Sequence, residues 1–234
     1  MADSHSRKES PGRCAGLVPL LLTLALLTAC ASHPERASTY TVKRGDTLYA
    51  IAWRHKLDWQ DLARWNGIRR DYVIQPGQVL KLYPSHTARA SARPAPASAR
   101  QTSPARAPNG PPLQWQWPVS GGTATLTSRP NGGQGLTVNG QLGEDIRAAA
   151  AGHVVYTGSG LLGYGQLVIL KHNETYLSAY GHTQSVAVHE GDAVAAGQRI
   201  ATMGPGPQGD AMLYFEIRIN GTPGNPLSFL PTRP

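Results

Sequence analysis

Histidine side chains are the first groups in this sequence that suggest chemistry, because a neutral imidazole binds zinc and accepts protons near neutral pH. The C-terminal half contains His153, His172, His182 and His189. A hydrolytic zinc site needs three protein ligands and an open position for water. These histidines include no i, i+2 or i, i+4 pair, the spacings that place two side chains on one face of a strand or helix. We therefore expect His153, His172 and His189 to be solvated or structural.

Both cysteines of the sequence, Cys14 and Cys30, lie near the N-terminus. A basic stretch precedes an apolar run at residues 15–27, which is too short to span a bilayer as an ordinary helix. The run leads into residues 27–30 (LTAC), which resemble a bacterial lipobox with Cys30 as the acylated residue. We expect residues 1–29 to be a lipoprotein signal peptide and residues 30–38 a lipid-anchored spacer. A plain signal peptide with an incidental cysteine is the alternative.

The residue after the proposed lipid site is Ala31. By resemblance to Gram-negative lipoproteins, this implies an anchor in the outer membrane, on its periplasmic face. The mature chain would then carry no free thiol, which excludes a disulfide and a cysteine zinc site.

Length and composition favour two modest domains. The chain has 234 residues, only 15% of them charged, with 26 Gly and 19 Pro, a composition typical of turn-rich β structure with an unstructured tract. The net charge of +8 fits contact with anionic peptidoglycan or phospholipid. No basic helix with interleaved aromatic residues is present, so we expect no nucleic-acid partner.

A small β-α-α-β unit is predicted at residues 39–83. Residues 40–42 are expected to form a strand, and Asp46 to cap a helix over residues 47–55. A second helix is expected at residues 58–66, ending before Gly67, followed by a strand at residues 78–82.

This unit resembles a LysM domain through residues 40–48 (YTVKRGDTL) and 74–78 (IQPGQ). The resemblance implies binding of N-acetylglucosamine-containing glycans in a shallow groove between two loops, where turns expose backbone polar groups. Taken singly, Gly45 and Gly77 are explained as turn residues and Leu48 as core. The candidate glycan-binding residues are Gly45, Asp46, Thr47, Leu48, Tyr49, Ile74, Gln75, Pro76 and Gly77.

Residues 84–112 are rich in Pro, Ala and Ser, and Arg supplies their only charges. Such a segment buries too little apolar surface to fold, so we expect a disordered linker that spans at most about 80–90 Å. We expect a change in the C-terminal domain to leave the tethered LysM domain unaffected.

Residues 113–234 are predicted to form a mainly-β domain, an open barrel or a sandwich. Apolar, β-branched stretches at residues 152–156, 166–171, 176–180 and 213–219 read as strands, and glycine turns separate them. Almost no helix is expected here.

This region resembles the LytM/lysostaphin-type zinc peptidases, from residues 117–118 (WP) to 225–227 (NPL). In that family the zinc ligands come from a His-x-Gly-x-Asp motif and from the second histidine of His-x-His-Phe-Glu. Here residues 212–216 read MLYFE, so Met212 and Tyr214 replace the two histidines of the second motif.

The first ligand motif falls at residues 133–138, with Gly133 in place of His and Thr137 in place of Asp. A second alignment, at residues 141–145 (QLGED), is rejected because residues 143–152 match a downstream family segment. Neither alignment supplies the first histidine, and only His182 keeps its family position. The resemblance therefore implies a degenerate domain with no catalytic residue, no metal and no cofactor.

Residues 213–218 (LYFEIR) and 162–165 (LGYG) resemble the murein hydrolase activators of the EnvC and NlpD kind. In that group the former substrate groove binds a cell-wall amidase and pulls an inhibitory element off the amidase's own zinc site. Packing inside the barrel is the alternative role for Tyr164 and Tyr214. By position, the candidate amidase-binding residues are Gln134, Thr137, Tyr164, His182, Tyr214 and Arg218.

The sequence thus predicts a non-catalytic outer-membrane lipoprotein that binds peptidoglycan and activates a periplasmic N-acetylmuramoyl-L-alanine amidase in cell-wall remodelling and cell separation. Two alternatives stay open. One is a zinc-dependent peptidoglycan endopeptidase, and the other is a passive peptidoglycan-binding tether.

Overall fold

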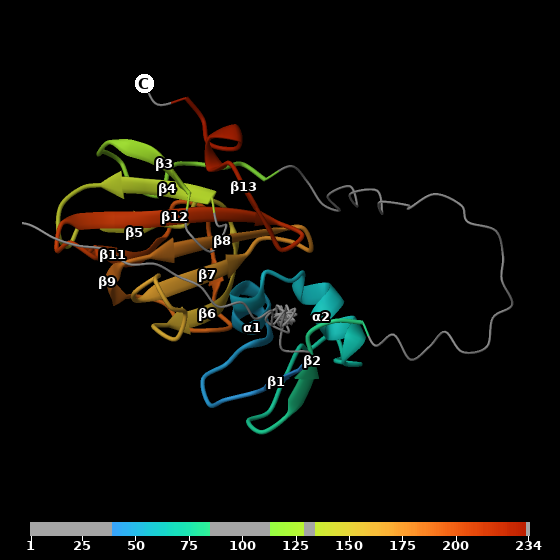
Figure 1. Cartoon of the computed structure of the whole chain (residues 1–234). Helices are drawn as coiled ribbons and strands as arrows, with labels where there is room; N and C mark the ends of the chain where they lie inside the picture. Colours follow the sequence, from blue (N-terminus) through green and yellow to red (C-terminus); the bar gives the residue numbers. More distant parts are fainter. Residues whose placement is uncertain (1–38, 85–112, 129–133, 233–234) are drawn as a thin grey trace, which may run out of the picture. The chain divides into compact units, whose positions relative to one another are not determined.

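The structure is a computed structural model that describes residues 39–84, 113–128 and 134–232 (Figure 1). These residues belong to one compact unit, Arg36–Pro234. The expectations for residues 1–38, including acylation of Cys30, and for residues 85–112 lie outside the described residues. Within the described ranges no helix is both long and apolar enough to cross a membrane.

The LysM-like region (residues 39–84) has the predicted β-α-α-β order. Its elements are β1 (Thr39–Thr41), α1 (Leu48–His55), α2 (Trp59–Trp65) and β2 (Val79–Lys81), and β1 pairs antiparallel with β2 (Figure 1).

Both helices begin at side chains that accept hydrogen bonds from backbone N–H groups. Thr47 is the N-cap of α1 and accepts a bond of 3.1 Å from the Ala50 N–H. Asp46, the predicted cap, instead accepts from the Tyr40 hydroxyl at 2.7 Å and from the Lys43 N–H at 2.8 Å. The prediction was one residue off because a threonine and an aspartate both serve as N-caps. Asp58 caps α2 by accepting hydrogen bonds from the Gln60 and Asp61 N–H groups.

The peptidase-like region (residues 113–232) is mainly β, as predicted, and among its described residues the only helical element is a 3₁₀ turn, η2 (Pro226–Ser228). Its strands are β3 (Ala124–Ser128), β4 (Gln134–Asn139), β5 (Asp145–Arg147), β6 (Gly152–Gly158), β7 (Leu167–Lys171), β8 (Tyr176–Gly181), β9 (Thr183–Val186), β10 (Ala193–Val194), β11 (Arg199–Pro205), β12 (Ala211–Ile219) and β13 (Thr222–Gly224).

Strand β12 is central, because it pairs antiparallel with β8 and with β4 (Figure 1). Tyr214 lies between Thr137 on β4 and Gly181 on β8. Side chains alternate across a strand, so Leu213 and Phe215 enter one core while Tyr214 reaches the opposite face of the sheet.

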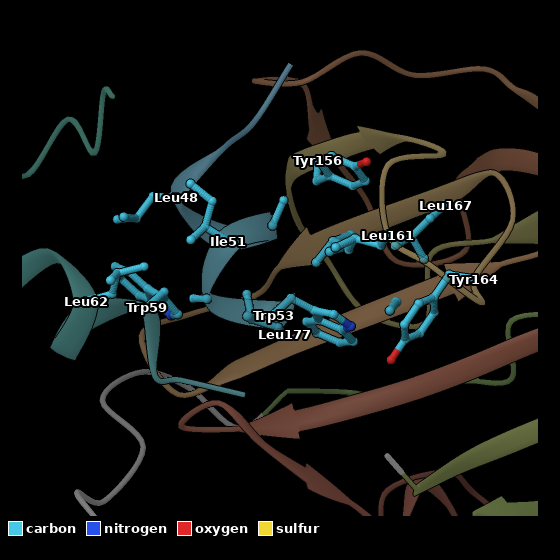
Figure 2. Close-up of a cluster of buried hydrophobic side chains, with 14 of the residues drawn as sticks. Leu48, Ile51, Trp53, Trp59, Leu62, Tyr156, Leu161, Tyr164, Leu167 and Leu177 are labelled. Atoms are coloured by element: carbon cyan, nitrogen blue, oxygen red, sulfur yellow. The ribbon is translucent and has the colours of Figure 1, made fainter. Parts of the chain in front are cut away.

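The two buried clusters are of different kinds. One lies wholly within the peptidase-like region and contains Leu213, Phe215 and Ile217. The other is shared, because Trp53 of α1 packs with Tyr164 of the loop between β6 and β7 and with Leu177 of β8 (Figure 2). The expected independence of the two regions is therefore wrong within the described residues, since an apolar sheet face and an apolar helix face cover each other.

Candidate functional site

A cavity of about 630 Å³ lies on the face of the sheet that presents Tyr214. Its apolar lining consists of Leu162, Pro207, Met212 and the Tyr214 ring. The polar lining residues are Thr127, Ser128, Thr137, His182, Gln208 and Asp210. The cavity therefore has an apolar floor surrounded by hydrogen-bonding groups. This composition suits a ligand or a protein segment.

Local sequence explains how Tyr214 fits into the sheet. A Cβ atom on Gly135 of β4 would lie 2.7 Å from the Tyr214 hydroxyl oxygen, so only glycine leaves room for the ring. Beside it, the Thr137 hydroxyl lies 2.9 Å from the Thr127 hydroxyl, which ties β4 to β3 at the cavity wall.

His182 follows β8 in a left-handed backbone conformation, with φ of 60°, which is uncommon for a residue other than glycine. Its backbone N–H donates to the Tyr164 carbonyl and its own carbonyl accepts from the Gly204 N–H, each at 2.8 Å. These two bonds hold the imidazole at the cavity, where only 8% of the residue is exposed.

The groups at the family's ligand positions do not fit a hydrolytic zinc site. Thr137 and Tyr214 offer hydroxyls, and Met212 a thioether, whereas zinc takes thiolate, imidazole and carboxylate ligands. The Tyr214 hydroxyl donates to the Glu216 carboxylate at 3.1 Å. Gly133 lies outside the described residues. In the part of the chain that the structure describes, no group of three or more His, Cys, Asp or Glu side chains is placed to hold a metal ion.

A buried carboxylate organises the same face of the sheet. Glu216 is 0% exposed and accepts from the hydroxyls of Tyr164 at 3.0 Å and Tyr214 at 3.1 Å. The guanidinium of Arg218 donates to it through Nε at 2.7 Å. Burial raises the pKa of Tyr164, and the Glu216 charge raises this pKa further, which keeps the hydroxyl a donor.

Arg218 also joins the two regions of the chain. Its Nη1 donates to the Trp53 carbonyl at 2.9 Å, and its guanidinium carbon lies 3.6 Å from the centroid of the Trp53 ring. This is the cation–π arrangement, which is strongest when water is excluded. Arg218 is 3% exposed and lies beneath α1.

The structure thus divides the six predicted amidase-binding residues into two groups. Thr137, His182 and Tyr214 line the cavity. Gln134, Tyr164 and Arg218 do not. Gln134 pairs with Ser128 at the start of β4, and Tyr164 and Arg218 are 3% exposed.

Leu162 is a lining residue that was not among the predicted site residues. It is 97% exposed, while the adjacent Leu161 is 2% exposed. Two leucines before a glycine carried no signal as to which one is buried. Pro207 and Asp210 belong to the turn between β11 and β12, whose Gly- and Pro-rich composition marked a loop without marking a site.

The candidate glycan-binding residues are also of two kinds. Gly45, Gln75, Pro76 and Gly77 are exposed on two loops, which the Gly77 N–H joins by donating to the Val42 carbonyl at 2.8 Å.

The others have structural contacts. Leu48 is 1% exposed in the core, Thr47 caps α1, and Asp46 is held by Tyr40 and Arg54. Ile74 packs against the shared cluster, and Tyr49 is half-buried beside Trp59.

Comparison with known families defines the class of protein. Residues 40–82 match the LysM domain and residues 131–226 match Peptidase family M23. A LysM domain followed by an M23 domain without a zinc ligand set among its described residues is the class that the fold and the site define.

The chain is 41% identical to a Pseudomonas aeruginosa protein named Lipoprotein NlpD/LppB homolog, over 88% of this chain and 81% of that protein. It is 39% identical to the Escherichia coli lipoprotein YgeR, over 92% of each. It is 33% identical to the Escherichia coli protein named Murein hydrolase activator NlpD, over 84% of this chain and 68% of that protein. The chain belongs to the NlpD family of lipoproteins.

Among solved structures, the catalytic domain of the antimicrobial peptidase lysostaphin from Staphylococcus simulans is 25% identical to this chain. It matches 47% of this chain and 89% of its own length, with a TM-score of 0.40.

Proposed function

We propose that the protein is a non-catalytic lipoprotein of the bacterial envelope that binds peptidoglycan and activates a periplasmic N-acetylmuramoyl-L-alanine amidase. The observation that carries the proposal is the cavity at Tyr214. Thr137 and Tyr214, which the family resemblance aligns with metal ligands, line this cavity with hydroxyl groups beside an apolar floor. The name of the Escherichia coli relative, Murein hydrolase activator NlpD, supports the activator role.

The chemistry of the cavity favours a protein segment as its occupant. Leu162 stands at the rim with 97% of its surface exposed, and covering one such side chain contributes about 1.5–3 kcal/mol. Tyr214 and Met212 form the floor, and the hydroxyls and His182 can bond to a backbone at the edge. A few apolar anchors surrounded by polar groups are typical of energetically important interface centres.

In this proposal the amidase carries out the hydrolysis at its own metal. Occupation of the cavity by an amidase segment draws that segment away from the amidase's active site. A zinc endopeptidase finds no support in the donor chemistry at Met212 and Tyr214. A passive tether would leave the cavity without a role.

We further propose that acylation of Cys30 anchors the chain in the outer membrane, facing the periplasm, with a LysM domain at residues 39–83, a linker at residues 84–112 and the degenerate domain at residues 113–234. The names of the relatives, which call them lipoproteins, support the anchor. The exposed loops at Gly45 and Gln75 support a glycan groove.

The deciding experiment measures dye release from labelled sacculi by periplasmic amidases, with and without the protein. We expect the wild-type protein to stimulate an amidase and to release no dye by itself. Leu162→Ser should reduce the stimulation about tenfold or more while the variant still pellets with sacculi. Val73→Ser, a change at another exposed apolar residue, away from the cavity, is the matched control.

Other outcomes would contradict the proposal. Dye release by the protein alone that a chelator abolishes would establish the endopeptidase. Binding to sacculi without stimulation of any periplasmic amidase would establish the passive tether.

A further inference from the structure

A second cavity, of about 420 Å³, is lined by both regions of the chain. The LysM domain contributes Tyr49 from α1 and Arg70 and Tyr72 from the loop after α2. The M23 domain contributes His153 of β6, Lys171 of β7 and Glu174 from the turn after β7. None of these M23 residues lines the first cavity.

Aromatic rings form one wall of this second cavity. The rings of Tyr49 and Tyr72 lie 6.1 Å apart, and both contact Trp59, at 5.0 and 4.8 Å between centroids. The Tyr72 ring packs edge to face on both Tyr49 and Trp59, and such aromatic pairs add stability beyond the area that they bury. Burial raises the pKa of Tyr49 and of Tyr72, so both hydroxyls stay protonated and can donate or accept. Such a wall suits the apolar C–H face of a sugar ring.

The M23 side of the cavity is fixed by Lys171. Its Nζ lies 4.2 Å from the Trp59 ring centroid and 2.7 Å from a Glu174 carboxylate oxygen. The other Glu174 carboxylate oxygen accepts from Gln60 Nε2 at 2.8 Å. The one carboxylate of the lining is thus already engaged by a cation and an amide.

The lining also contains an arginine and a histidine, Arg70 and His153. Arg70 and His153 are exposed, and neither side chain makes a hydrogen bond or ion pair with the described residues. Arg70 belongs to the LysM domain and His153 to the M23 domain. A planar guanidinium binds carboxylates through paired hydrogen bonds, so the cavity is suited to a ligand that carries both a sugar ring and a carboxylate.

We infer that this cavity binds the anionic, peptide-bearing sugar of peptidoglycan, next to the sugar held in the LysM groove. The inference rests on the proposed glycan binding by the LysM domain. Tyr49 connects the predicted LysM groove with this cavity. It is the last residue of the predicted glycan loop that starts at Gly45, and it also lines the cavity. A glycan strand carries alternating sugars, and the lactyl group of every second sugar bears the peptide with its free carboxylates.

In this assignment the M23 domain contributes to the recognition of peptidoglycan. The LysM loops alone would not distinguish a bare N-acetylglucosamine oligomer from a strand with peptides. Arg70 and His153 would make that distinction, since only the second ligand offers a carboxylate.

The test compares two soluble ligands by calorimetric titration of the full-length protein. One is the tetramer of N-acetylglucosamine, which has no carboxylate, and the other is a disaccharide-peptide released from sacculi. Arg70→Ser and His153→Glu should each weaken binding of the disaccharide-peptide about tenfold. Both should leave the affinity for the tetramer unchanged. The matched controls are Arg69→Ser and His189→Glu, which change exposed residues outside the cavity and should bind both ligands normally.

Three results would overturn the inference. Wild-type affinity of Arg70→Ser and His153→Glu for the disaccharide-peptide would show that the cavity takes no part. An equal loss for both ligands would make Arg70 part of the LysM groove alone. If the wild-type protein binds neither ligand, the proposed glycan binding by the LysM domain is also wrong. This outcome differs from failure of the cavity inference alone, in which the wild-type protein still binds the tetramer.

Discussion

At the scale of single residues, the buried Glu216 carboxylate organises the sheet face that carries the first cavity. A buried charge is costly unless it is paired and hydrogen-bonded, and Arg218, Tyr164 and Tyr214 supply that compensation. Two hydroxyl groups and a guanidinium thus hold this sheet face together. Tyr214 keeps its ring toward the first cavity.

We therefore expect Arg218 to contribute to the free energy of unfolding. Arg218→Met leaves the Glu216 charge buried with two hydroxyl donors only, and breaking a buried pair in this way costs about 3–5 kcal/mol. Urea unfolding measures the free energy of unfolding. The double variant with Glu216→Gln should recover part of the loss, because it removes the unpaired charge. A loss below about 1 kcal/mol for Arg218→Met, within the range of a surface pair, would contradict the buried pairing.

His172 makes folding stability depend on pH. Its Nδ1 lies 2.8 Å from the Ala151 carbonyl oxygen and its Nε2 2.7 Å from the Ser178 hydroxyl. Burial lowers the pKa of His172 to about 4 from an ordinary value of 6.5, against the opposing effect of the Ala151 carbonyl. Between those pH values His172 is therefore protonated in the unfolded chain and neutral in the folded chain.

The stabilising contribution of neutral His172 is complete above about pH 6.5 and falls as the pH decreases toward 4. Denaturant midpoints between pH 7.5 and 4.5 should therefore decrease more steeply for the wild-type protein than for His172→Asn. Parallel curves for the two proteins, or an NMR titration of His172 near 6.5, would contradict this account.

At the scale of elements, strand β12 connects the first cavity to helix α1. Tyr214 at one end of the strand lines the cavity, and Arg218 at the other end contacts Trp53. Both side chains point the same way because they are an even number of residues apart. A single strand therefore lines the first cavity at one end and makes the contact between domains at the other.

Trp53 is expected to hold the two domains together. A protease site introduced into residues 84–112 allows the chain to be cut after folding. The two pieces of the wild-type protein should then elute together on size exclusion. Trp53→Ala removes the ring under Arg218 and the packing against Tyr164, a loss of about 3–5 kcal/mol, and its pieces should separate. Val79→Ala, at a residue with 60% exposure, is the control, and separation of the wild-type pieces would refute the contact.

Local signals explain which elements were predictable. The helices expected at residues 47–55 and 58–66 occur as Leu48–His55 and Trp59–Trp65, because caps and apolar spacing are encoded within a few residues. The orientation of Tyr214 followed from alternation along β12. Alternation gives the face of Arg218 but not what covers that face, and the cover, Trp53, lies 165 residues away in the sequence. Leu162 was missed because its exposure depends on the path of a loop.

At the scale of the whole molecule, the proposed anchor and the cavities have separate tasks. In the proposal, the lipid holds the chain at a membrane, while the first cavity binds a protein partner and the second binds a glycan. Family resemblance gave the order of the two domains. It did not give the contact between the domains, because that contact depends on surfaces whose partners are far apart in the sequence.

Cys30→Ser should move the protein from the membrane fraction to the soluble periplasm. A single acyl chain binds a membrane only marginally, so stable anchoring depends on the several chains that a lipobox cysteine acquires. Flotation with outer-membrane vesicles measures the change, and Cys14→Ser is the control. If Cys30→Ser still floats, the anchor lies elsewhere in the chain.

The shared cluster around Trp53 and Tyr164 also has a thermodynamic consequence. Two modules joined only by a tether melt separately, each at its own temperature. Two modules that share a hydrophobic core unfold together. The heat of unfolding is then absorbed in one cooperative transition. The evolutionary corollary is that α1 and the M23 sheet face cannot change independently, since a substitution in either one alters the melting of both.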